Sequence, residues 1–114
     1  MNSKAVVRNS GNISIVDLSG RIVIGEDAHV VRDTVKGLVA TGTKSIVLNL
    51  KDVTYIDSAG LGELVGAYTT VTNGGGKICL LNTQAKVKDL LQITKLYTVF
   101  QSFDSESEAL ASFA

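Results

Sequence analysis

Residues 45–72 read SIVLNLKDVTYIDSAGLGELVGAYTTVT, and this stretch decides which fold class the chain belongs to. Its first six residues are apolar at both odd and even positions, which predicts a strand covered on both faces. From Ser58 or Ala59 to Thr72, apolar residues recur at helical spacing and predict a helix. We interpret residues 51–57 as the connector. A buried strand followed by a helix is the repeating unit of an α/β fold with parallel strands.

The rest of the chain continues this alternation behind an N-terminal hairpin. Residues 5–8 and 13–18 flank the turn NSGN and predict the hairpin, and RIVI after Gly20 predicts a further short strand. The later elements are a helix over 27–41 that ends at Gly42, a strand over 77–81, a helix from 82 or 83 to about 94, an edge strand over 99–103, and a short helix behind the capping pattern of Ser105 and Glu108. We therefore predict one α/β domain over residues 1–114, with a mixed, mostly parallel sheet and about four helices.

Composition excludes several classes of function. Lys and Arg together number 11, as do Asp and Glu, so the chain has no electrostatic footprint for nucleic acid or an anionic membrane. No apolar run is long enough for a signal peptide or for membrane insertion. The single cysteine, Cys79, predicts a reducing compartment and a small buried apolar side chain. We therefore expect a cytoplasmic protein.

The glycine-rich stretch after residue 57 does not match a nucleotide-binding motif. Gly60, Gly62 and Gly66 give G-x-G-x-x-x-G, which is one residue longer than the dinucleotide fingerprint. That fingerprint also follows its strand directly, whereas residues 51–57 intervene here. Residues 79–82 hold no acid for a ribose, and the phosphate-binding pattern GxxxxGK[ST] is absent. We expect no bound cofactor.

The same stretch also lacks the partners that catalysis needs. Ser58 as a nucleophile would require a base, and the only histidine, His29, stands beside the apolar stripe of the first predicted helix. We interpret His29 as a structural or surface residue. No cluster of His, Cys, Asp and Glu has the spacing of metal ligands. We therefore expect no enzyme and no metal site.

A third interpretation is that the turn presents a serine. Asp57 or Ser58 would cap the helix with a side-chain oxygen. Gly60 and Gly62 each cost a helix about 1 kcal/mol relative to Ala, which suggests that bare backbone around Ser58 is useful. A helix N-terminus also stabilises an anion such as a phosphate. The alternative is that Ser58 is an ordinary N-cap, and physical reasoning alone ranks this alternative first.

Residues 47–68, VLNLKDVTYIDSAGLGELVGAY, change that ranking because they closely resemble the hallmark segment of the STAS domain family. The resemblance is closest to the bacterial anti-sigma factor antagonists, in which D-S-[SA]-G-L-G opens a helix after a buried strand. The N-terminal strands, KICLLN and KVKDLLQITKLYTVF also look like family segments in family order. The matching positions are Asp57, Ser58, Ala59, Gly60, Leu61 and Gly62.

This resemblance implies partner switching. In the family, an anti-sigma factor that is also a serine kinase phosphorylates the serine that matches Ser58. The unmodified antagonist binds this kinase and releases a sigma factor, and a phosphatase resets the phosphorylated form. The resemblance implies a free monomer whose six motif residues bind the partner. Asp57 would orient the Ser58 hydroxyl or cap the helix, and both roles stay open.

One departure concerns the loop after the predicted hairpin. Family members often carry an Asp shortly after the glycine that ends the second strand. After Gly20 this chain has apolar Val23 or Ile24 at that place, and the acids follow as Glu26 and Asp27. We expect Glu26 and Asp27 to contact the partner at the rim. STAS domains also serve as non-phosphorylated scaffolds in stress-signalling assemblies or as transporter-associated subunits, but the Asp-Ser pair favours the switch.

Overall fold

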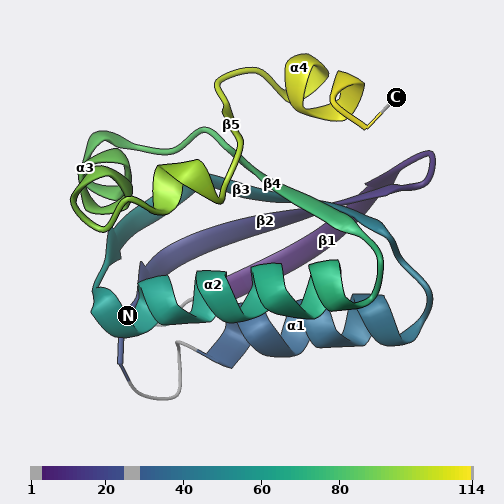
Figure 1. The fold of residues 1–114 in the computed structure, drawn as a ribbon, viewed down its shortest axis with the longest axis horizontal. Coiled ribbons are helices and arrows are strands. Elements are labelled where there is room, and N and C mark those ends of the chain that lie inside the picture. Colours follow the sequence, from purple (N-terminus) through teal and green to yellow (C-terminus); the bar gives the residue numbers. More distant parts are fainter. Residues whose placement is uncertain (1–3, 25–28, 114) are drawn as a thin grey trace.

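A five-stranded mixed sheet forms the centre of the molecule (Figure 1). The computed structural model describes residues 4–24 and 29–113. The strands are β1 (Lys4–Ser10), β2 (Ile13–Ile22), β3 (Ser45–Ile56), β4 (Lys77–Leu81) and β5 (Ser102–Phe103), in the spatial order β1-β2-β3-β4-β5. β1 and β2 form the predicted antiparallel hairpin, and every later pair of neighbours is parallel. The predicted α/β class and mixed sheet are confirmed.

The helices cover both faces of this sheet. They are α1 (His29–Ala40), α2 (Ser58–Asn73), α3 (Ala85–Ile93) and α4 (Glu106–Ala111), with a 3₁₀ turn, η2, at Leu96–Thr98. Figure 1 shows α1 and α2 side by side on one face and α4 on the other. Gly42 and Gly75 follow α1 and α2 with φ of +95° and +82°, and the first of these confirms the predicted end of the helix at Gly42.

Two apolar cores explain why residues 45–50 are apolar at both parities. The larger core lies between the sheet and helices α1, α2 and α3, and it takes Leu48 and Leu50 from β3. The smaller core lies under α4 and consists of Ile15, Val47, Cys79, Leu81 and Ala109. Successive side chains of β3 therefore enter different cores, as a strand buried on both faces requires. Burial also raises the pKa of the Cys79 thiol to about 11, so the expected inert apolar role holds.

The prediction for residues 51–57 was wrong, because β3 continues through the expected connector to Ile56. The prediction of a separate strand at RIVI was also wrong, because β2 is continuous to Ile22. The two extensions pair with each other: Gly20 with Val53, Arg21 with Tyr55, and Ile22 with Ile56. Much of the β3 extension is exposed, so it lacks the two-sided apolar pattern that identified residues 45–50.

Two later boundaries also differ from the predictions, and a third agrees. α3 begins at Ala85 rather than at 82 or 83, because Asn82 is left-handed, with φ of +56°, and its N–H still bonds Phe103 O of β5 at 2.8 Å. The expected edge strand shrinks to two residues behind η2. α4 begins as predicted, since the Ser105 side chain accepts the Glu108 N–H.

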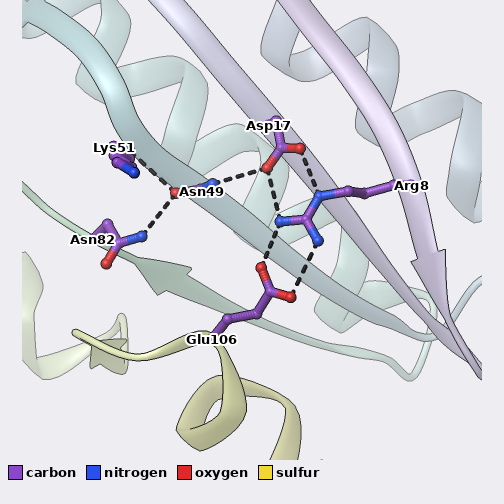
Figure 2. Close-up of polar contacts among 6 residues, drawn as sticks. All are labelled: Arg8, Asp17, Asn49, Lys51, Asn82 and Glu106. Atoms are coloured by element: carbon purple, nitrogen blue, oxygen red, sulfur yellow. Dashed lines mark hydrogen bonds and ion pairs between the residues drawn. The ribbon is translucent and has the colours of Figure 1, made fainter.

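A polar network fastens α4 to the sheet (Figure 2). Arg8 of β1 donates to Asp17 of β2, with Nε to Oδ2 at 2.6 Å, and forms a two-pronged bond to Glu106 at the start of α4, at 2.5 and 3.1 Å. Asn49 Nδ2 donates to Asp17 Oδ1 at 2.8 Å and extends the network to β3. The Arg8 guanidinium holds the pKa of both carboxyl groups below its ordinary value.

Candidate functional site

Asp57 is the N-cap of α2. It has extended backbone angles, φ −103° and ψ −175°, and its Oδ1 accepts the Gly60 N–H at 2.8 Å. Ser58 is therefore the first helical residue. The alternative that Ser58 itself is an ordinary N-cap is wrong, because the capping oxygen belongs to its neighbour.

The Asp57 carboxylate also links the segment after β2 to the start of α2 by hydrogen bonds. Its second oxygen, Oδ2, accepts the Ile24 N–H at 3.0 Å, and the Asp57 N–H donates to Ile22 O at 3.3 Å. The Ile24 N–H, followed by that of Gly60, holds the pKa of Asp57 below its ordinary value. Of the two roles left open for Asp57, the geometry supports capping, and it adds the contact with Ile24.

Gly60 and Gly62 serve different purposes. A Cβ at Gly60 would lie 2.0 Å from Ile22 O and 2.8 Å from Ile56 Cγ1, so this glycine lets α2 approach the end of β2. The expectation that Gly60 leaves bare surface is wrong, because Gly60 is buried in this contact. A Cβ at Gly62 would meet nothing within 4 Å, and Gly62 is exposed, as expected.

The remaining motif residues divide into exposed and buried positions. Ser58 is exposed, and Ala59 and Asp57 are partly exposed. Leu61 is 5% exposed and packs in the larger core, so its side chain anchors the helix. Glu26 and Asp27 lie outside the described residues.

Two exposed residues, one bonded to Asp57 and one two positions before it, were not identified from the sequence as site residues. Ile24, which the Asp57 carboxylate holds, is 79% exposed. Tyr55, two positions before Asp57, is 40% exposed and lies between two basic side chains. The sequence did give a signal for Ile24, because Val23 or Ile24 stands at the place where family members often carry an Asp. Tyr55 had no such signal, because its strand assignment was missed.

His29 belongs to a contact between α1 and α2. Its Nδ1 lies 3.8 Å from Glu63 Oε1, and Arg32 Nη2 lies 3.0 Å from Glu63 Oε2. Glu63 is 7% exposed, so its carboxylate forms part of the helix interface. This assigns His29 to a structural or surface role as expected. Within residues 4–24 and 29–113, no group of three metal-ligating side chains occurs.

This chain is similar to known proteins over nearly its whole length. The family model described as the STAS domain matches residues 4–109. The anti-sigma F factor antagonist of Paenibacillus polymyxa is 27% identical over 96% of this chain and 94% of its own. The anti-sigma-B factor antagonist of Bacillus subtilis is 34% identical over 84% of this chain and 86% of its own.

Solved structures agree with the observed topology. A crystal structure of a protein from Thermotoga maritima superposes with a TM-score of 0.87 at 28% identity, over 95% of this chain and 92% of the other.

No helix in the described part of the chain is long and apolar enough to cross a membrane.

Proposed function

Because the chain belongs to the STAS domain family, we propose that it is an anti-sigma factor antagonist that is switched by phosphorylation of Ser58. The observation that carries this proposal is that two neighbouring residues, Asp57 and Ser58, have different roles. Asp57 supplies the capping oxygen of α2, while Ser58 stands exposed at the first helical position. The fold therefore does not require the Ser58 hydroxyl as a cap, and a kinase can reach it.

The partner surface centres on the exposed end of α2. Ser58 and Gly62 are exposed on α2, and Ala59 is partly accessible. The backbone N–H of exposed Ile24 bonds the carboxylate of Asp57, the N-cap of α2. Gly60 and Leu61 act indirectly, since both are buried and fix where the helix begins. An exposed apolar side chain on a segment bonded to the start of α2 is suited to a partner pocket.

Phosphorylation would change binding more than folding. A phosphoserine adds about −1.5 to −2 charges at one exposed point. The helix N-terminus tolerates this charge in the free domain. Inside an interface, the same charge must lose its water and costs several kcal/mol unless the partner supplies a cation. The unmodified chain would therefore bind the anti-sigma factor kinase, release a sigma factor, and dissociate when phosphorylated.

The proposal assigns the chemistry to the partners. The kinase brings the ATP, a phosphatase resets Ser58, and this chain is a non-enzymatic cytoplasmic monomer that needs no cofactor. This agrees with the inert buried Cys79 and with the structural role of His29.

Intact mass spectrometry tests the proposal. The chain is incubated with ATP and the anti-sigma factor kinase encoded in the same genome, with Ser58→Ala as the control. We expect the mass of one phosphate on the wild-type chain and none on the variant. A stable complex without phosphate transfer would instead indicate a non-phosphorylated scaffold, and absence of both would refute the proposed function.

A further inference from the structure

Three exposed side chains from three elements form a cluster close to Ser58. Tyr55 of β3 lies beside Arg21 of β2, its partner in the strand register. The guanidinium carbon of Arg21 is 5.4 Å from the centre of the Tyr55 ring, and Nζ of Lys86 on α3 is 5.9 Å from the same centre. Arg21 and Lys86 are exposed, and Tyr55 is 40% exposed. We refer to these three residues as the basic-aromatic patch.

The geometry of this patch is fixed by its scaffold. Arg21 and Tyr55 are held by strand pairing, and the first residues of α3 are tied to β3 because the Gln84 amide donates to the Lys51 carbonyl. Contact with the Tyr55 ring restricts the side chains of Arg21 and Lys86 in the free protein. Less side-chain conformational entropy is therefore lost on binding.

The patch carries positive charge that its surroundings do not neutralise. In the part of the chain that the structure describes, neither Arg21 nor Lys86 forms an ion pair, although Asp52 of β3 and Asp89 of α3 are exposed. Arg8, by contrast, is neutralised by two carboxylates. The whole chain has no net charge, so this is a local feature suited to orienting a protein partner.

The patch also lies within reach of a partner that covers Ser58. Tyr55 and Ser58 are three residues apart, so their Cα atoms are separated by at most about 11 Å. An ordinary interface takes roughly 800 Å² and 20–30 residues from each partner, which is far more than this span.

Building on the proposed function, we propose that the basic-aromatic patch docks an acidic segment on the surface of the anti-sigma factor kinase. Arg and Tyr are enriched among the residues that contribute most to interfaces. The positive charges of Arg21 and Lys86 would steer the kinase toward Ser58 and set its orientation. Their main effect would be on the association rate.

The test compares two double charge reversals that change the net charge equally. Arg21→Glu with Lys86→Glu removes the patch. Lys36→Glu with Lys95→Glu is the control, because Lys36 and Lys95 are exposed and also form no ion pair within the described ranges. Association with the kinase from the same genome is measured by stopped flow at low and high salt, and Ser58 phosphorylation is measured at saturating kinase.

We expect the patch variant to associate at least about tenfold more slowly at low salt, with the difference closing at high salt. The control should stay within about twofold of wild type, and saturating kinase should still phosphorylate all three proteins. Equal slowing of both variants, or of neither, would overturn the patch while leaving the proposed function standing. A wild-type chain that neither binds the kinase nor accepts phosphate would overturn both.

Discussion

Replacing Gly60 by Ala tests whether the start of α2 is set by its close approach to β2. The added Cβ would lie 2.0 Å from Ile22 O, about 1.3 Å closer than a normal carbon–oxygen contact, and 2.8 Å from Ile56 Cγ1. Gly to Ala in a helix ordinarily adds about 1 kcal/mol of stability. Here the overlap is with backbone, which cannot rotate away, so we expect a loss of about 1–3 kcal/mol instead.

Gly62→Ala is the matched control in the same helix. A Cβ there meets nothing within 4 Å, so this variant should be neutral or more stable by up to about 1 kcal/mol. Urea unfolding, followed by circular dichroism, measures both free energies of unfolding. The two variants should therefore differ by roughly 1–4 kcal/mol, with Gly60→Ala the less stable of the two. A Gly60→Ala protein as stable as Gly62→Ala would refute the close approach of α2 to β2.

Three further predictions concern the cap, the α4 network and the switch. Asp57→Ala should lower the urea midpoint more than Asp57→Asn, which keeps one capping oxygen, and equal midpoints would argue against the cap. Arg8→Leu should lower stability by about 1 kcal/mol at pH 7, allowing for solvent screening. The pKa values of Asp17 and Glu106 are lowered in the folded state. The contribution of Arg8 to the free energy of unfolding is therefore present above about pH 4.5 and is lost as the pH falls through the folded pKa values. Urea midpoints of wild type and Arg8→Leu should therefore converge as the pH falls through the folded pKa values of Asp17 and Glu106, and a constant difference would contradict the network. Ser58→Asp should unfold like wild type yet bind the kinase weakly, and a large loss of stability would argue against a tolerant helix N-terminus.

Most of the fold could be predicted from periodicity. The first half of β3 and the apolar stripe of α2 were identified because the buried apolar residues of each element recur at regular spacing in the sequence. The extension of β3 to Ile56 was not, because those residues are held by pairing with the end of β2, and pairing between segments 34 residues apart leaves no local pattern.

The site was only partly predictable for the same reason. The Asp-Ser-Ala-Gly-Leu-Gly motif located the start of α2, but the assignment of the cap to Asp57 rather than Ser58 required the backbone angles. The purpose of Gly60 depends on a carbonyl from β2, and the role of Asp57 depends on an N–H after β2. Both contacts are tertiary, so no single stretch of sequence contains them.

The most direct test of the central claim is the affinity of the anti-sigma factor kinase for the unmodified chain and for the chain phosphorylated on Ser58. Isothermal titration calorimetry with purified forms of each gives both dissociation constants. A buried, unpaired phosphate costing about 3 kcal/mol would weaken binding by roughly a hundredfold. Dissociation constants that agree within about twofold would contradict the account and leave Ser58 as an exposed residue of a STAS scaffold.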